Sequence, residues 1–415
     1  MPSRPGPRSY WLATLLAAAL LMVTMGARQS QGLFVSPLNT STGLGIASIS
    51  LAMAIGQFVW GAIQPIAGAV ADRYGPGRVL AAGLIVLAIG SAITPYVTGS
   101  AGLIFALGIL AAAGAGAGSF SVLIGSAAQH LPVDKRGMAA GVINAGGSFG
   151  QFVFAPLVQR LIFVLGWTGA MWSLAVIALA ALPIARALRR QPAPDGGQSS
   201  QAHPSSAGDA SRKGIRAAVL HALRDPSYLL LHAGFFTCGF HIAFLITHLP
   251  GEVQLCGQPA VVASWSIAII GLANIMGSLA AGWGTQRFRS KYILFWMYAS
   301  RTALILVYLA APKTELTFYL FAAGLGLTWL ATVPPTAAVV GKLFGGRYLA
   351  TLFGLTLLTH QTGAFLGAWL GGLAITGLGD YTVMWYLDAG LAAIAALVNL
   401  PIRENRISPA LQAAS

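Results

Sequence analysis

The sequence predicts an all-α membrane protein with twelve transmembrane helices arranged as two six-helix bundles. Of its 415 residues, 56% are hydrophobic and 8% are charged, whereas a soluble domain carries about 25% charged residues. Twelve stretches of roughly 20 mainly apolar residues are each long enough to cross a bilayer as a helix. Short basic segments separate these stretches in a regular alternation. These three observations exclude a soluble globular protein and predict a polytopic one that lies in a lipid bilayer.

The apolar stretches form two groups of six on either side of a polar segment. They cover 11–37, 46–71, 78–97, 101–128, 138–163 and 167–187, and then 227–249, 259–284, 292–311, 315–341, 349–373 and 380–401. The segment between the groups is rich in Gln, Ser, Pro, Gly and Ala, a composition typical of flexible linkers. We therefore expect a first bundle over 1–188, a cytoplasmic linker over 189–226 and a second bundle over 227–415.

Basic residues predict how the chain is oriented in the membrane. The connections on one predicted side hold Arg4, Arg8, Arg73, Arg78, Lys135, Arg136, the seven basic residues from Arg186 to Arg224, Arg287, Arg289, Lys291, Lys342, Arg347, Arg403 and Arg406. The connections on the other side hold only Arg160 and Lys313. By the positive-inside rule, both termini and the central segment are cytoplasmic. The net charge of +14 is thus a topology signal. No basic helix with interleaved aromatics and no zinc spacing points to nucleic acid.

The two groups of apolar stretches also repeat each other. Residues 26–28 match 239–241 at an offset of 213, Gly141 and Gly150 match Gly354 and Gly363 at the same offset, and Gly68 matches Gly282 at 214. Each match alone is weak because glycine is abundant, but a near-constant offset at three places indicates two related halves. Parallel halves of six helices are a recognised plan of membrane transporters.

The strongest motif joins the second and third stretches, and it reads Gly68-Ala-Val-Ala-Asp72-Arg73-Tyr-Gly75-Pro-Gly-Arg78. We expect Gly68 to allow close helix packing, and Asp72 and Arg73 to supply charge that bridges to a neighbouring helix end. The motif resembles the cytoplasmic signature loop of the major facilitator superfamily. A second copy over 282–291 has lost the acid and the second glycine, as is usual for that superfamily. The resemblance implies a central cavity between two bundles that rock about a midplane site.

Two further segments are similar to a narrower group within that superfamily. The segment 28–37 resembles the first helix, and the segment 141–156 the fifth helix, of bacterial monocarboxylate-porter-type members. The better-known carboxylate carriers of this group have an acid or Asn in the eighth helix and an Arg four residues later. Asn274 and Ser278 take these two positions here. The expected Arg is missing, so the resemblance places the anion-pairing role elsewhere or puts the substrate class in doubt.

Arg28 is the leading candidate for that role. A guanidinium in hydrocarbon costs roughly 2.5 kcal/mol or more, so it is retained only where water, protein or a ligand receives it. Its planar fork of donors suits a carboxylate or phosphate. Because the first helix lines the cavity in the superfamily, we expect Arg28 to bind substrate or act in gating. The alternative is a side chain that snorkels or pairs with helix carbonyls. Gln31 lies one turn further along the same face, whereas Gln29 and Ser30 point elsewhere.

Each of the other charged or titratable residues inside the apolar stretches has two possible roles. Arg301 either contacts the ligand or pairs with a neighbouring helix through Asn274 or Asp388. Asp388 either carries a proton or neutralises an Arg. Imidazole titrates near neutral pH, so His241 and His360 either couple transport to protons or donate hydrogen bonds between helices.

The remaining candidates are neutral. His360 and Gln361 form a polar island with Thr359 that we expect to line the cavity. Asn144, Ser148 and Gln151 either line it or hydrogen-bond between helices.

These residues favour a secondary transporter of small organic anions, with monocarboxylates as the expected class and protons as the expected coupling ion. No Gly-x-x-x-x-Gly-Lys-Ser/Thr motif supports ATP-driven transport, and we expect neither a cofactor nor an enzymatic activity. We expect a monomer in a bacterial inner membrane. One alternative is a drug or metabolite exporter of the same fold, with a larger apolar cavity and no dependence on Arg28. Another is a membrane sensor or scaffold that transports nothing.

Overall fold

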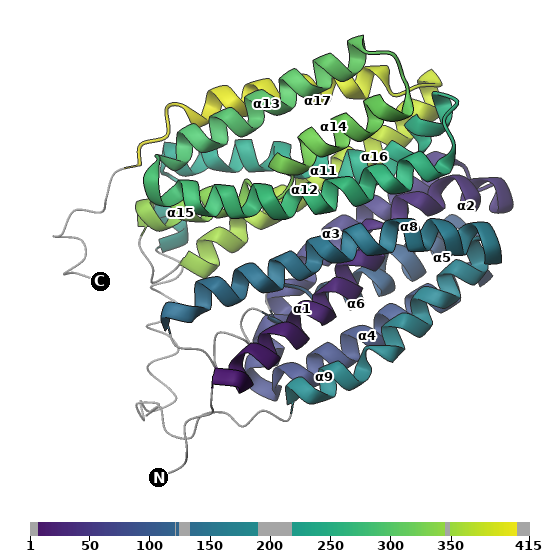
Figure 1. The fold of residues 1–415 in the computed structure, drawn as a ribbon, viewed down its shortest axis with the longest axis horizontal. Coiled ribbons are helices and arrows are strands. Elements are labelled where there is room, and N and C mark those ends of the chain that lie inside the picture. Colours follow the sequence, from purple (N-terminus) through teal and green to yellow (C-terminus); the bar gives the residue numbers. More distant parts are fainter. Residues whose placement is uncertain (1–6, 121, 124–132, 190–217, 345–348, 405–415) are drawn as a thin grey trace.

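The computed structural model describes residues 7–120, 122–123, 133–189, 218–344 and 349–404, and these residues form helices and their connections without a strand (Figure 1). Ten segments are long and apolar enough to cross a membrane. One of them, Gly141–Leu188, folds back at Gly166, where φ is 71° and ψ is 170°, and so supplies two crossings. A further long helix, Leu349–Leu378, carries His360 and Gln361 in its middle. The predicted fold of twelve spans is confirmed.

The first half of the chain supplies six spans. In chain order its elements are α1 (Pro7–Gln29), η1 (Gln31–Phe34), α2 (Val35–Thr42), α3 (Ile46–Tyr74), α4 (Pro76–Ile93), η2 (Thr94–Tyr96), α5 (Ser100–Leu103), η3 (Ile104–Ala111), α6 (Ala112–Ala117), α8 (Val133–Ala180) and α9 (Leu182–Arg189). Here α1, η1 and α2 form one span with an irregular turn, and α5, η3 and α6 form another, in which η3 is a π-helix.

The second half supplies the other six spans. Its elements are α11 (Pro226–Leu255), α12 (Ala260–Arg287), α13 (Ser290–Ala310), α14 (Glu315–Thr328), α15 (Val333–Phe344), α16 (Leu349–Leu378) and α17 (Thr382–Asn399). The span made of α14 and α15 is interrupted between Thr328 and Val333. Pro334 and Pro335 follow the interruption directly, and a proline disfavours helical backbone at the residue before it.

The halves lie side by side, close together at the end of the molecule where α2 lies (Figure 1). Their main contacts pair α3 with α16 and α8 with α12. Within the halves, α1 packs against α8 and α11 packs against α16. These four helices, together with α3 and α12, therefore surround the region between the halves.

The sequence repeat corresponds to the same helix crossing in both halves. A Cβ added to Gly150 would lie 2.2 Å from the carbonyl oxygen of Met22, and one added to Gly363 would lie 2.1 Å from that of Phe236. Gly26 and Gly239, 213 residues apart, lie at the partner positions on α1 and α11. Glycine lets two membrane helices approach until their backbones touch, which explains why this pattern occurs twice.

The prediction of close packing at Gly68 is wrong. A Cβ added to Gly68 would meet no atom of the described residues within 4 Å. Two other glycines of α3 face neighbouring helices: Gly56, where α3 packs on η3 and α6, and Gly61, which lies against Gln361 of α16. Gly75 has a clear physical role, because its φ of 89° between α3 and α4 favours glycine. Arg78 is exposed, and the side chains of Asp72 and Arg73 lie outside the described part.

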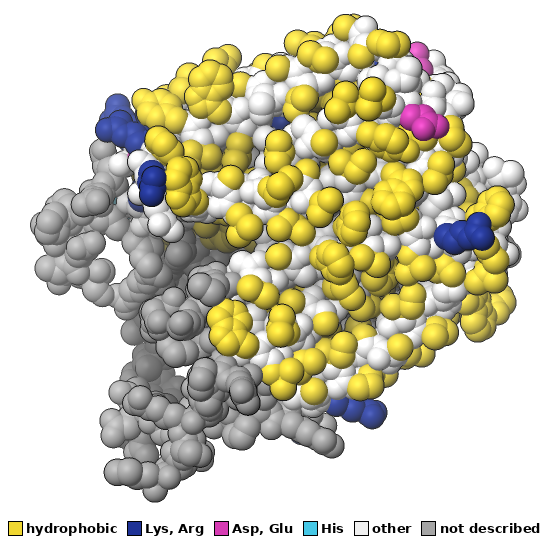
Figure 2. Space-filling model, in the orientation of Figure 1, with side chains coloured by type: hydrophobic (Ala, Val, Ile, Leu, Met, Phe, Trp, Pro, Cys, Tyr) yellow, Lys and Arg dark blue, Asp and Glu magenta, His cyan; other side chains and the backbone are white. Residues whose placement is uncertain are grey.

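The outer surface is apolar between two charged ends. Figure 2 shows hydrophobic side chains over the middle of the visible face, with basic side chains toward both margins. Large exposed residues such as Trp296, Val307 and Leu320 belong to this apolar surface. An apolar belt of this kind matches the hydrocarbon of a bilayer.

Candidate functional site

Arg28 lies at the end of α1, in the region between the two halves. Its side chain is only 8% exposed. Nη2 donates a hydrogen bond to Oε1 of Gln57, and Nη1 donates to Oε1 of Gln29 over 3.3 Å. The guanidinium carbon lies 4.1 Å from the centroid of the Trp60 ring, within the range of a cation–π interaction. Gln57 and Trp60 are one turn apart on α3, so both meet the same guanidinium.

The charge of Arg28 is not neutralised by an acid in the described residues. The ion pairs found there join His241 to Asp388 and Lys342 to Glu404. The groups that bind Arg28 are amide oxygens and an indole ring, which carry no net charge. A buried cation held by neutral groups alone is an unusual and costly arrangement.

A chain of amides connects Arg28 to the other half. Nε2 of Gln29 donates to Oε1 of Gln151 on α8 over 3.3 Å, and Nε2 of Gln151 donates to the carbonyl oxygen of Ile267 on α12 over 3.0 Å. Gln29, rather than Gln31, is therefore the neighbour that contacts Arg28. The reason is that α1 ends at Gln29, so Gln31 begins the 3-10 segment η1 and no longer shares a helical face with Arg28.

Asn274 of α12 forms a second link between α8 and α12. Its Nδ2 donates to Oγ of Ser148 over 2.9 Å, and its Oδ1 accepts from the backbone N–H of Leu330 over 2.9 Å and from Oγ of Ser278 over 3.3 Å. Asn144 contributes its carbonyl oxygen, which accepts from Ser148 over 3.4 Å. Asn274 thus joins both halves and the interrupted span.

His241 of α11 and Asp388 of α17 form a buried pair, with Nδ1 2.5 Å from Oδ2. Both side chains are at most 1% exposed. The His241 ring lies 6.0 Å from the ring of Trp329, which belongs to the interruption between α14 and α15. Nε2 of His241 and Oδ1 of Asp388 make no hydrogen bond with the described residues. Each member of the pair therefore keeps one polar atom available.

Arg301 has a different environment from Arg28. Its Nη2 donates to the carbonyl oxygens of Thr328 and Trp329, the latter over 2.8 Å, and its Nε donates to Oγ1 of Thr328 over 3.1 Å. Nη1 lies 3.3 Å from Sγ of Cys238. Helix α14 ends here, so its last carbonyls lack helical partners. Arg301 binds these carbonyls rather than Asn274 or Asp388, because the interrupted helix offers them directly.

His360 and Gln361 lie on α16 between the halves. Nε2 of Gln361 is 3.4 Å from Nδ1 of His360. A Cβ added to Gly61 of α3 would lie 2.3 Å from Cγ of Gln361, so Gln361 packs beside the residue that follows Trp60. Nε2 of His360 and Oε1 of Gln361 make no hydrogen bond with the described residues.

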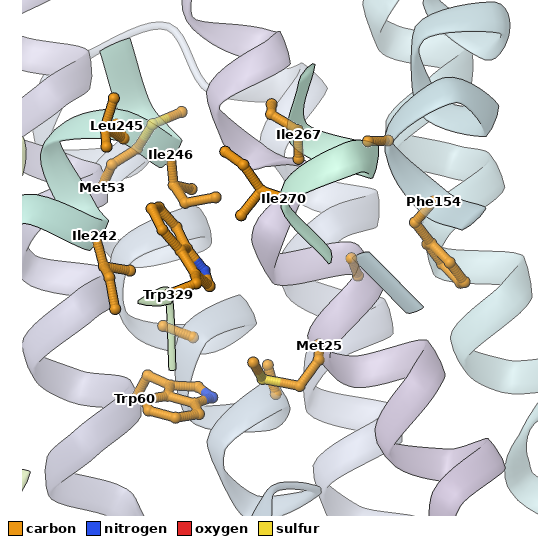
Figure 3. Packing of buried hydrophobic residues seen from close by; sticks show 14 of the residues in the cluster. Met25, Met53, Trp60, Phe154, Ile242, Leu245, Ile246, Ile267, Ile270 and Trp329 are labelled. Atoms are coloured by element: carbon orange, nitrogen blue, oxygen red, sulfur yellow. The ribbon is translucent and has the colours of Figure 1, made fainter. Parts of the chain in front are cut away.

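Two aromatic residues of this region, for which the sequence predicts interface or packing roles, were missed as candidate site residues. Trp60 and Trp329 come from different halves, and both indole nitrogens lack a hydrogen-bond partner among the described residues. Figure 3 shows both nitrogens on the side of their rings where Met25 lies. Gln57, which binds Arg28, was also missed. A polar residue one turn from a Trp inside an apolar stretch was a signal that could have found it.

The arrangement is that of a twelve-span membrane protein with polar groups buried between two helical halves. Residues 14–367 match the model of the Major Facilitator Superfamily, and the chain belongs to this superfamily of membrane transporters. It is 24% identical over 399 residues to monocarboxylate transporter 13 of Rattus norvegicus, covering 94% of this chain and 89% of that protein. It is 24% identical over 380 residues to the oxalate:formate antiporter of Oxalobacter formigenes, covering 89% and 86%.

A solved structure supports the same fold. The crystal structure of a D-xylose-proton symporter matches with a TM-score of 0.76 at 14% identity. The match covers 96% of this chain and 100% of that chain. At this identity the likeness concerns the fold alone.

Proposed function

We propose that this transporter carries small organic monocarboxylates together with protons, by alternating access, and that Arg28 binds the carboxylate. The observation that carries the proposal is the buried guanidinium of Arg28, which lies between the halves without an acidic partner in the described residues. A carboxylate would supply the missing negative charge, and its two oxygens match the guanidinium fork.

The second half offers groups that could take a proton. His241 and Asp388 are close enough to share one, and each keeps a polar atom without a hydrogen bond in the described residues. A proton that travels with a monocarboxylate cancels its charge, which lowers the cost of moving it through a bilayer-spanning protein. His360 is the other imidazole of the region.

The names of the relatives support small carboxylates as the substrate class, and they include a dicarboxylate, because oxalate has two carboxyl groups. One is named for monocarboxylates and the other for oxalate and formate, and each match extends over most of both chains. The distribution of basic residues supports an orientation with both termini on the cytoplasmic side of a bacterial inner membrane.

Transport into proteoliposomes tests the role of Arg28. We expect labelled monocarboxylates, with lactate and pyruvate in the panel, to accumulate, and Arg28→Ala and Arg28→Lys to reduce uptake at least tenfold. Arg160→Ala removes an exposed Arg that stacks on Phe163, and it should transport like the parent. Uptake of the whole panel that is unaffected by Arg28→Ala would refute the proposal. If apolar drugs were then carried, the exporter alternative would hold.

The coupling ion is tested separately. An outside-acid pH gradient should accelerate uptake by the parent protein. His241→Gln and Asp388→Asn should still exchange labelled for unlabelled substrate, but the pH gradient should no longer accelerate their uptake. If acceleration persists in both variants, the pair has a structural role and the proton binds elsewhere.

A further inference from the structure

The region beside Arg28 is apolar and aromatic. One buried hydrophobic cluster contains Trp60 of α3, Met25 of α1, Ile246 of α11, Ile270 of α12 and Trp329 of the interruption between α14 and α15 (Figure 3). They come from both halves of the molecule, and all are at most 6% exposed. Apart from the two indole nitrogens, their side chains offer no conventional hydrogen-bonding group. A ligand whose carboxylate reaches Arg28 therefore extends its remaining atoms toward thioether, aliphatic and indole surfaces.

The two indole N–H groups add donors but no acceptors. Trp60 is 6% exposed and Trp329 is fully buried, and neither Nε1 has a partner among the described residues. An indole N–H can only donate, so it suits an acceptor such as a carboxylate oxygen and not a donor-only group such as an ammonium. Both nitrogens face the same side in Figure 3. These two donors therefore suit a ligand with one anionic group and an otherwise apolar surface.

Of the buried arginines in the described residues, Arg28 is the better placed to bind a ligand, because its hydrogen bonds go to side-chain amide oxygens and not to backbone carbonyls. Arg301 is fully buried, and its nitrogens are taken up by Thr328, the Trp329 carbonyl and Cys238. His241 is paired with Asp388. A second carboxylate on the ligand would therefore enter an apolar region without a positive partner, which disfavours its binding.

Trp329 is held in a fixed position. Its carbonyl oxygen accepts from Arg301, and the next residue, Leu330, donates its N–H to Asn274. Cys238 also lies against this segment, with Sγ 3.2 Å from Oγ1 of Thr332. A wall that is fixed before binding favours a rigid planar ligand, because little ordering is needed on either side. Aromatic rings pack well against indole in offset or edge-to-face geometry.

We infer that the preferred substrate is a monocarboxylate with an aromatic or bulky apolar body, such as an arylacetate or arylpropionate, rather than a short hydroxy acid, formate or a dicarboxylate. This inference rests on the proposed function, because it assumes that Arg28 binds a carboxylate. It adds that Trp60 and Trp329 determine specificity by contacting the body of the substrate.

Competition by unlabelled acids in the proteoliposome assay tests this inference. Phenylacetate should compete at least tenfold more strongly than acetate, lactate or formate, and phenylacetamide, which lacks the charge, should compete at least tenfold more weakly than phenylacetate. Phthalate, with two carboxylates, should also compete weakly. If acetate or lactate competes as well as phenylacetate while Arg28→Ala abolishes uptake, the aromatic preference is overturned and the proposed function stands. If no monocarboxylate depends on Arg28, both fail.

Variants of Trp60 provide a second readout. Trp60→Leu should weaken competition by phenylacetate at least fivefold more than competition by acetate, which loses only the support that the ring gives to Arg28. Trp60→Phe keeps a ring and should retain the preference for phenylacetate. Trp172→Leu replaces an exposed Trp of α8 and should behave like the parent. A loss in Trp60→Leu that is equal for phenylacetate and acetate would overturn the role of Trp60. The acid panel on the parent protein decides the question even if Trp60→Leu does not fold.

Discussion

Gly239→Ala should destabilise the protein through a single methyl group. The new Cβ would lie 1.8 Å from the carbonyl oxygen of His360, whereas ordinary van der Waals contact begins near 3.4 Å. Helices α11 and α16 would have to separate by about 1.6 Å, the difference between these values, along their main contact within the half. Overpacking of this kind typically costs about 1–3 kcal/mol. We therefore expect the free energy of unfolding in detergent to fall by about that amount.

Gly354→Ala is the matched control on α16. A Cβ at this position would meet no atom of the part of the chain that the structure describes within 4 Å, so we expect only the intrinsic effect of the substitution. Alanine is favoured over glycine inside a helix by roughly 0.5–1 kcal/mol, so this variant should be as stable as the parent or slightly more stable. If Gly239→Ala were equally stable, the backbone crossing would not be the reason for glycine in the repeat.

Three further predictions concern the buried polar groups and the contact between the halves. His241→Leu leaves Asp388 buried without its partner and should lower the free energy of unfolding by about 3–5 kcal/mol; replacing both by Leu should cost less, and a loss equal to the sum of both single variants would contradict the pairing. Arg301→Lys loses the forked donation to the carbonyl oxygens that end α14 and should lower that free energy by about 1.5–3 kcal/mol, whereas an unchanged unfolding midpoint in denaturant would argue against this role. Gly32→Ala places a Cβ 1.8 Å from the carbonyl oxygen of Ile246 and should push the halves apart at the α2 end. Spin-label distances between α2 and α11 should therefore lengthen. Unchanged distances would show that the added methyl group is accommodated without separating the halves.

The span pattern and the repeat could be predicted from sequence because they depend on composition and regular spacing. Twelve apolar stretches follow from length alone, and the offset of 213 residues marks equivalent crossings in both halves. Gly68 shows the limit of such reasoning, since a glycine in a motif does not reveal which face of its helix meets a neighbour.

The partners of the polar residues were harder to predict. The pairing of Gln29 with Arg28 depends on α1 ending at Gln29, and no proline or adjacent glycine in the sequence marks that end. Pro334 and Pro335 are residues typical of an irregular helix, but the sequence does not tell that Arg301 binds the carbonyl oxygens exposed just before them. Such contacts arise where irregular backbone meets a distant helix, which helical periodicity does not describe.

The division of the chain into two halves decides which hydrogen bonds survive a movement of one half against the other. Arg28, Gln29, Gln57 and Gln151 all lie in the first half, so their mutual hydrogen bonds travel with it as one body. The bonds from Gln151 to Ile267 and from Asn274 to Ser148 cross between the halves and must break in any large rotation. The guanidinium of Arg28 belongs to the first half, and the His241–Asp388 pair belongs to the second half. The separation between the positive site and the titratable site is therefore the quantity that such a rotation changes.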